Sequence, residues 1–208
     1  MFIKGGFVVF SILLGLLKLS EQKETVKITV YYETYCPDSI DFIQKQLTPL
    51  MGEFNRYPNW LEIDLVPFGK AKEVAHLEFE CQHGPKECLG NKLNACAIKS
   101  LVTHSKKPHY LKLINFIYCT MNAENQIKAA YKCAQQTSVN YARMIRCYVD
   151  GTGDKLIEDY GYRTAALDPT LSWVPTIVFN DVFNKTESDE AQQNLYGVVC
   201  RYNPDACT

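Results

Sequence analysis

The stretch "TVKITVYYETYCPDSI", residues 25–40, changes its hydrophobic pattern at a single cysteine. Residues 25–32 are β-branched and aromatic and contain neither glycine nor proline, which predicts a β-strand. From Ser39 onward, apolar residues recur at the spacing of three and four that indicates one face of a helix. These residues are Ile40, Ile43, Leu47 and Leu50. Cys36 therefore lies at an elbow between a strand and a helix.

A second predicted strand follows the helix and completes a βαβ unit. Pro37 suits the first turn of the helix, and Pro49 is expected to end or bend it. Residues 61–69, "LEIDLVPFG", form the next predicted strand. Strands connected through a helix in this way are normally parallel, and the connection is right-handed. Ligand sites of such units lie at the carboxyl ends of the strands, which is where Cys36 is found.

The rest of the chain consists of a helical segment and a final strand and helix. Residues 70–168 begin with a loop rich in cysteine, glycine and proline at 81–91, and helical patterns follow it. These patterns cover residues 111–118 and 127–134, and roughly 138–149 and 154–166. Residues 173–180 predict a strand, Asn180-Asp181 a hairpin turn, and residues 187–195 a short helix. This order predicts an α/β, thioredoxin-like fold with a large helical insertion at about 70–168.

The composition is that of an ordinary globular domain. The 208 residues are 47% hydrophobic and 22% charged, and the net charge is −1. Phosphate binding needs concentrated positive charge, and no run of lysine or arginine is longer than two residues. A nucleic-acid partner is therefore not expected.

The first 20 residues are predicted to be a secretory signal. Lys4 precedes an apolar stretch at residues 7–17, which is too short to span a membrane. Cleavage is expected near Ser20, which leaves residues 21–208 as one domain; an uncleaved anchor is the alternative. No other segment is apolar over a sufficient length, so no stable membrane insertion is expected after cleavage. "NKT" at Asn184 predicts one glycan, with an unused site as the alternative.

Cys36 has a functional and a structural interpretation. The unpaired N–H groups and the positive end of the helix would stabilise a thiolate, the species that attacks a disulfide. Alternatively, Cys36 is a buried cysteine that happens to begin a helix. Val174-Pro175, which enters the last strand, is expected to form a cis-proline loop that faces the elbow and pairs with a bound peptide. A proline on an edge strand is the alternative, but the order of the elements favours the loop.

The stretch "CQHGPKECLGNKLNAC", residues 81–96, carries a more specific pattern. It resembles the signature of the gamma-interferon-inducible lysosomal thiol reductase family at every fixed position. These positions are Cys81, Gln82, His83, Gly84, Glu87, Cys88, Asn91 and Cys96. The stretches "LVPFGKA" and "YYETYCPDS" are also similar to the family, so that the resemblance covers nearly the whole mature chain.

The resemblance implies a thioredoxin-like fold with an inserted, helical, disulfide-bonded part. It also implies reduction of protein disulfides at acid pH in endosomes or lysosomes, with some members secreted. Many members of the family have a Cys-x-x-Cys active site. The first cysteine of that motif corresponds to Cys36, whereas the second position holds Ser39.

The nine cysteines are expected to leave one thiol unpaired, because their number is odd. If Cys36 is the free thiol, the other eight can form four structural disulfides. They are Cys81, Cys88, Cys96, Cys119, Cys133, Cys147, Cys200 and Cys207. Eight cysteines allow many connectivities, and the sequence does not choose among them, although Cys200 and Cys207 are expected to pair locally.

A metal site is the rival interpretation of the signature. Cys81, His83, Cys88 and Cys96 are zinc-type ligands. Their spacing fits no common zinc pattern, and an exported chain favours disulfides, so no metal is expected. We interpret His83 as a hydrogen-bonding residue of the loop.

A lone Cys36 can carry out only half of the dithiol reaction. Its sulfur can form a mixed disulfide, but Ser39 cannot release the substrate, because an oxygen forms no stable disulfide. Its hydroxyl can still donate a hydrogen bond to the thiolate. The favoured hypothesis is a single-thiol reductase of disulfide-containing proteins, located in lysosomes or endosomes or secreted. An external thiol such as glutathione or cysteine would be the co-reductant, without any other cofactor. The alternatives are a non-catalytic binding protein that retains the fold and the proline groove, and a thiol that captures its partner covalently.

Overall fold

The computed structural model describes residues 25–54, 60–102 and 109–207. The predicted signal at residues 1–20 lies outside this part of the chain. Within it, no helix is long and apolar enough to cross a membrane.

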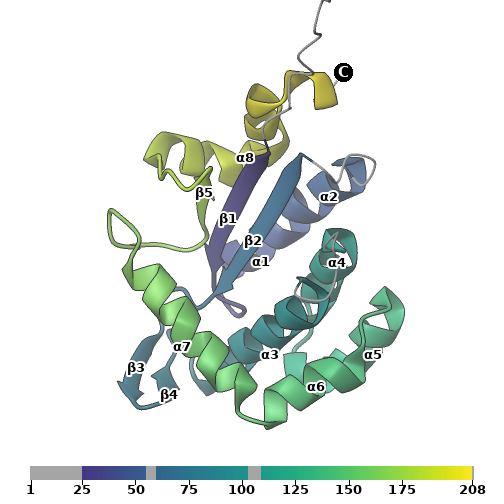
Figure 1. Cartoon of the computed structure of the whole chain (residues 1–208), viewed down its shortest axis with the longest axis vertical. Helices are drawn as coiled ribbons and strands as arrows, with labels where there is room; N and C mark the ends of the chain where they lie inside the picture. The colour runs from purple at the N-terminus through teal and green to yellow at the C-terminus, as the bar shows by residue number, and fades with distance from the viewer. Residues whose placement is uncertain (1–24, 55–59, 103–108, 208) are drawn as a thin grey trace, which may run out of the picture.

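A three-stranded sheet forms the centre of the molecule (Figure 1). Strand β1 (Val26–Tyr32) lies between β2 (Leu61–Pro67), which is parallel to it, and β5 (Thr176–Phe179), which is antiparallel. The side chains of β1 are buried on both faces except that of Lys27, which is half-buried. This burial explains why the strand is an almost continuous run of β-branched and aromatic residues. The parallel βαβ unit and the mixed α/β character predicted from the sequence are confirmed.

The helix after β1 runs past Pro49, so the proline does not end it, which was one of the two expectations. It consists of α1 (Pro37–Phe42), a π-helical turn η1 (Ile43–Leu47) and α2 (Thr48–Phe54). Thr48 donates both its backbone N–H and its hydroxyl to the carbonyl of Ile43, the latter at 2.7 Å. The wider turn accommodates a proline without ending the helix, because it rearranges the hydrogen bonds that a proline cannot complete.

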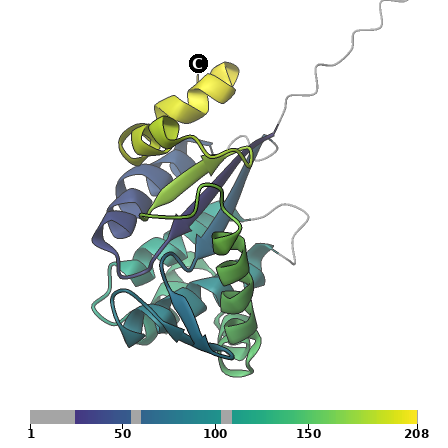
Figure 2. The ribbon, with the colours of Figure 1, turned by 90° about the vertical axis from the view of Figure 1, so that its left-hand side faces the viewer.

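The segment between β2 and β5 begins with a small β-hairpin, β3 (Lys72–Ala75) and β4 (Glu78–Glu80), which the sequence did not predict. Five helices follow it in the lower half of the molecule (Figures 1 and 2). They are α3 (Pro85–Val102), α4 (Tyr110–Met121), α5 (Gln126–Thr137), α6 (Tyr141–Val149) and α7 (Thr152–Ala165).

The prediction of a loop at 81–91 was wrong for its second half, because α3 begins at Pro85. Glycine and proline are also residues that begin helices, Pro85 being in the first turn here. Residues 93–97 of α3 are all buried, so this part of the helix shows no polar face and no period that the sequence alone would reveal.

The hairpin turn predicted at Asn180-Asp181 is present after β5, but no second strand follows it. Asn180 and Asp181 do form a tight turn with positive φ, but Val182 makes only an isolated bridge to Phe179. The chain then enters α8 (Lys185–Tyr202), and the short 3-10 helix η2 (Pro204–Cys207) follows. The Asn184 side chain caps α8 by accepting the N–H of Glu187 at 3.1 Å, so the chain becomes helical before a second strand can form.

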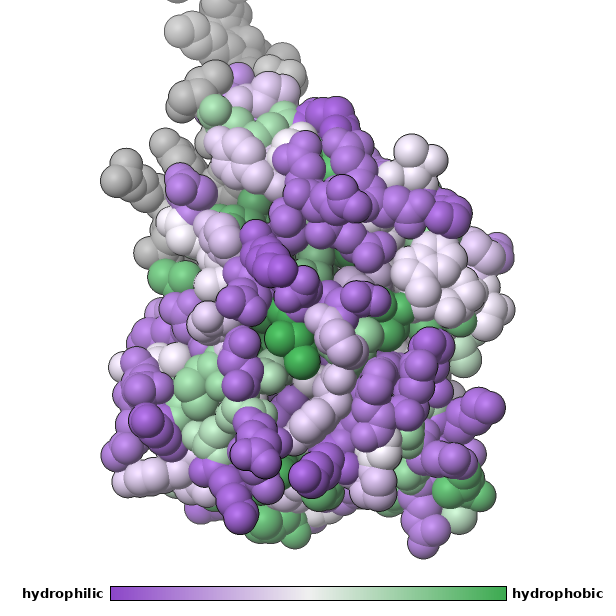
Figure 3. Space-filling view, turned by 180° about the vertical axis from the view of Figure 1, so that it is seen from behind, coloured by the Kyte–Doolittle hydropathy of each residue, from purple (hydrophilic) through white to green (hydrophobic). Residues whose placement is uncertain are grey.

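The two faces of the sheet bury different clusters of side chains. One face packs against α1, α2, α4 and α8 through β1 residues such as Ile28, Val30 and Tyr32. The other packs against α7 through Tyr31, Val66 and Val178. On the molecular face opposite that of Figure 1, hydrophobic side chains occur in small areas among hydrophilic ones (Figure 3).

Four disulfides hold the helices together, and Cys36 is the free cysteine. Cys96–Cys147 joins α3 to α6, and Cys119–Cys133 joins α4 to α5. Cys81–Cys88 closes the turn before α3, and Cys200–Cys207 joins α8 to η2. All eight cysteines that remain after Cys36 is set aside are therefore paired.

Removal of the Cys96–Cys147 disulfide is expected to cost more stability than removal of the tail disulfide. The two bridges span 51 and 7 residues. The chain entropy that they remove from the unfolded state corresponds to about 4 and about 2 kcal/mol. Urea unfolding of the double variants Cys96→Ala/Cys147→Ala and Cys200→Ala/Cys207→Ala measures this difference. Equal losses of unfolding free energy would contradict it.

Candidate active site

Cys36 occupies the N-cap position of α1, directly beyond the carboxyl end of β1. The residue is only 6% exposed, and its carbonyl accepts the first helical hydrogen bond from Ile40 at 3.0 Å. Its Sγ donates to the carbonyl of Val174 at 3.8 Å. The Val174–Pro175 peptide bond is cis, and both residues are buried. The structure thus brings together the elbow thiol and the proline loop, which are far apart in the sequence.

Ser39 is fully buried, but its hydroxyl is used by the backbone of the elbow. Its Oγ accepts the N–H of Glu33 at 3.4 Å. In the described part of the chain, no hydrogen bond joins Ser39 to Cys36, whose thiol is directed to Val174. The expected bond from Ser39 to the Cys36 sulfur is therefore not the arrangement in this structure.

The signature residues of α3 hold the backbone of the elbow. Asn91 Oδ1 accepts both the N–H and the hydroxyl of Thr34, each at 3.0 Å. Glu87 Oε2 accepts the N–H of Tyr35 at 3.3 Å. Glu87 and Asn91 are both buried and lie one helical turn apart, so their side chains reach the same loop. The residue directly before Cys36 is thereby fixed to α3.

Gln126, which lies outside the signature, also fixes the backbone of the elbow. Gln126, at the start of α5, donates its side-chain amide to the carbonyl of Thr34 at 2.6 Å. Gly90 lies where α3 passes Thr34 and Gln126, and an added Cβ would overlap both side chains. The elbow can approach α3 this closely because position 90 has no side chain.

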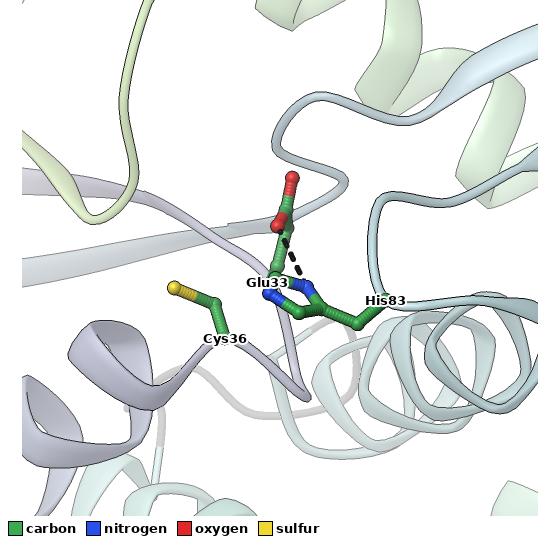
Figure 4. Close-up of side chains that lie close together, drawn as sticks. All are labelled: Glu33, Cys36 and His83. Carbon is green, nitrogen blue, oxygen red and sulfur yellow. Dashed lines mark ion pairs between the residues drawn. The ribbon is translucent and has the colours of Figure 1, made fainter.

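His83 connects the signature to the thiol. Its backbone N–H donates to Glu87 Oε1 at 3.0 Å, and its Nδ1 lies 2.6 Å from Glu87 Oε2 and 3.4 Å from Glu33 Oε2. One potential ligand atom each of Glu33, Cys36 and His83 lies within 4.8 Å of the other two. Figure 4 shows the ring with one nitrogen on the side of Glu33 and the other toward Cys36.

Glu33 was not recognised in the sequence, although it stands three residues before Cys36. Its carboxyl is fully buried; Oε1 accepts the N–H of Lys70 at 2.5 Å, and Oε2 has no hydrogen-bond partner among the described residues. Burial raises the pKa of Glu33, and the nearby Glu87 carboxylate raises it further, against the opposing effects of the Lys70 N–H and His83. Gly69 has a φ of +59°, and any Cβ there would overlap Glu33 Cγ.

A thiol, an imidazole and a carboxylate are also ligand types for transition metals. Three protein ligands are the number found in catalytic zinc sites, and a histidine that ligates zinc usually has its other ring nitrogen paired with a carboxylate, as Nδ1 of His83 is with Glu87. The same three groups are also close enough to exchange protons with one another, directly or through water. The zinc-type ligands of the signature are used otherwise, since Cys81, Cys88 and Cys96 lie in disulfides.

The remaining predicted site residues lie at the periphery. Gln82 is exposed, and Gly84 has a φ of +84° before the first turn of α3. Asn184 is exposed at the start of α8; its glycosylation stays a prediction.

A cysteine that caps a helix at the end of the central strand and faces a cis-proline loop is the site of a thioredoxin-like protein. The chain belongs to the family described as gamma interferon inducible lysosomal thiol reductase (GILT), whose sequence profile matches residues 27–137. GILT-like protein 1 of Drosophila melanogaster is 37% identical over 85% of this chain and 74% of that protein. The gamma-interferon-inducible lysosomal thiol reductase of Carassius auratus is 30% identical over 88% of this chain and 72% of that protein.

Solved structures of low sequence identity confirm the thioredoxin-like fold predicted from the sequence. DsbA of Chlamydia trachomatis superposes with a TM-score of 0.58 at 11% identity, over 88% of this chain and 90% of that one. Reduced DsbA of Mycobacterium tuberculosis gives 0.51 at 13% identity, over 96% and 97%. At such identities the likeness concerns the fold alone.

Gly90→Ala is expected to destabilise the protein, although alanine is the better helix former. The added methyl overlaps Thr34 and Gln126, which are held in the buried elbow. Gly52→Ala in α2 is the matched control, because nothing lies within 4 Å of its Cβ position. It should stabilise by up to about 1 kcal/mol. Urea unfolding compares the two; a gain of stability in Gly90→Ala, as in Gly52→Ala, would show that α3 does not constrain the elbow.

Glu33→Gln should change how stability depends on pH. Because the folded state raises the pKa of Glu33, its contribution is fully present below the unfolded pKa of about 4.3 and is lost as the pH rises through the folded value. The difference in unfolding free energy between the variant and the wild type should therefore shift in favour of the variant as the pH rises above the unfolded pKa. The exposed Glu78→Gln is the control. A constant difference between wild type and Glu33→Gln would contradict the assignment.

Proposed function

We propose that this chain is a thiol–disulfide oxidoreductase that reduces or exchanges disulfides of proteins through the single thiol of Cys36. The observation that carries the proposal is the free cysteine at the start of α1, with its Sγ 3.8 Å from the Val174 carbonyl. An extended peptide that pairs with the backbone before Pro175 would bring its own sulfur beside Cys36. Membership of a family described as thiol reductases supports the same chemistry.

The reaction needs an external reductant, because Ser39 provides no second sulfur. Cys36 Sγ bonds to one sulfur of the substrate disulfide, and the other sulfur leaves as a thiol. A small thiol then attacks the mixed disulfide and releases the reduced substrate, and a second molecule regenerates Cys36. In total, one substrate disulfide is reduced and two molecules of a small thiol, such as glutathione or cysteine, become one disulfide.

The proposed location is the lysosome, the endosome or the extracellular space. Four disulfides are unusual in a reducing cytosol. The raised pKa of Glu33 supports an acidic compartment, because its neutral form is then the favoured one in the folded protein.

Reduction of insulin at pH 5, with and without glutathione, tests the proposal. The wild type should turn over only with glutathione, and Cys36→Ala should be inactive. Ser39→Cys restores a second sulfur at a buried position, so a single turnover should then occur without glutathione. That turnover should leave a disulfide between Cys36 and the introduced cysteine, detectable by mass spectrometry. Ser39→Ala is the matched control: it also removes the hydroxyl that accepts the Glu33 N–H but adds no sulfur, so its turnover should still require glutathione.

Two other results would contradict the proposal in different ways. A stable mixed disulfide of Cys36 that glutathione does not release would indicate covalent capture. Insulin binding without turnover, unchanged in Cys36→Ala, would indicate a binding protein.

A further inference from the structure

We propose that His83 is the acid–base partner of the Cys36 thiol and exchanges a proton with its sulfur through the ring nitrogen that does not face the carboxylates. This inference deepens the proposed function, on which its role in turnover rests. It assigns to a signature residue a task that neither the fold nor the family name specifies.

The orientation of the ring is set by Glu87. Its carboxylate accepts from the backbone N–H of His83 and lies 2.6 Å from Nδ1, so this nitrogen carries a proton in both charge states of the ring. The remaining ring nitrogen is then the one that can gain or lose a proton. Figure 4 shows this nitrogen directed toward Cys36.

The distance is compatible with transfer across one water molecule or after a small rotation of a side chain. A ring nitrogen of His83 lies within 4.8 Å of the Cys36 sulfur. In the absence of substrate, catalytic hydrogen bonds are often longer than proton transfer requires, and they shorten when the substrate binds. The His83 side chain is 31% exposed, whereas Cys36 is 6% exposed, so His83 also connects the buried sulfur to solvent.

Carboxyl groups of two elements lie against the ring. Glu87 of α3 and Glu33 of the β1–α1 elbow both face Nδ1. On the β2–β3 turn, Lys70 reaches Glu33 through its backbone N–H. An imidazolium beside these carboxylates would stabilise a thiolate at Cys36, in the manner of a thiolate–imidazolium pair.

The proton balance of both half-reactions can then be closed within the site. In the first, the proton of Cys36 moves to His83 as Sγ bonds to the substrate sulfur, and His83 returns it to the sulfur that leaves. In the second, His83 takes the proton of the incoming small thiol and gives it to the released substrate sulfur. When the second small thiol attacks the disulfide that remains on Cys36, its proton passes through His83 to the Cys36 sulfur. The small thiol supplies the electrons here as it does in the proposed function, so no further reductant is needed.

The pH dependence of Cys36 alkylation tests this inference without any substrate. The non-reduced mature chain is treated with iodoacetamide between pH 4 and 10, and labelled Cys36 is quantified by mass spectrometry. The wild type should react well below the pH of about 8.5 at which an ordinary cysteine is half ionised. A single alkaline titration of the wild type, as for a cysteine in an unfolded peptide, would overturn the inference whatever the variants show.

The variant His83→Asn separates proton transfer from a structural role. Its amide N–H can keep the contact with Glu87, but it has no group that accepts a proton. The alkylation rate at about pH 5.5 should fall at least tenfold, and the two rates should converge at alkaline pH. His76→Asn, a change at an exposed histidine on the β3–β4 turn, should leave the profile unchanged. If His83→Asn retains the wild-type profile, the role of His83 is structural.

The outcome is distinguishable from failure of the proposed function. If the wild type shows an acid-reactive Cys36 that depends on His83 but no reduction of insulin, the inference holds and the proposed turnover fails. If insulin is reduced with glutathione while His83→Asn reacts like the wild type, the proposed function holds and the inference fails.

Discussion

The buried carboxylate of Glu87 is the group on which the candidate site depends. It accepts the N–H of Tyr35, the N–H of His83 and, through Oε2, the contact with His83 Nδ1. A buried carboxylate is tolerated only with such donors, and the buried N–H groups of a loop need such acceptors. The first turn of α3 therefore supplies the hydrogen-bond acceptor that the β1–α1 elbow needs, and the elbow supplies a donor that the buried carboxylate needs.

This mutual dependence explains the spacing of the signature. Glu87 and Asn91 lie one turn apart and hold successive residues of the elbow, while Gly90 leaves room for Thr34 between them. The Cys81–Cys88 disulfide holds the turn that carries His83 against α3, and Cys96 joins α3 to α6. The inserted helices thus position a site that is itself located on the sheet.

The parts of the molecule that the sequence predicted are those with a local signal. Strand β1, the change of period at Cys36 and the amphipathic helices α4 to α7 are examples. Helix α3 escaped recognition because it is buried on most sides, and the hairpin after β5 was overpredicted because Asn184 begins a helix instead. The role of Glu33 depends on contacts with His83 and Lys70 that only the folded chain forms, so no spacing in the sequence indicates it.

The position of Glu33 relates the chemistry of the elbow to pH. A carboxylate oxygen of Glu33 lies within 4.8 Å of the Cys36 sulfur, in surroundings where water screens charges poorly. When Glu33 is ionised, its charge opposes a thiolate at Cys36; when it is protonated, this opposition is removed. Burial raises the pKa of Glu33, so the neutral form persists to a higher pH than for an exposed glutamate. Oε2 of Glu33 has no hydrogen-bond partner among the described residues. The carboxyl group therefore opposes a thiolate at Cys36 least under acid conditions, and opposes it more strongly as the pH rises.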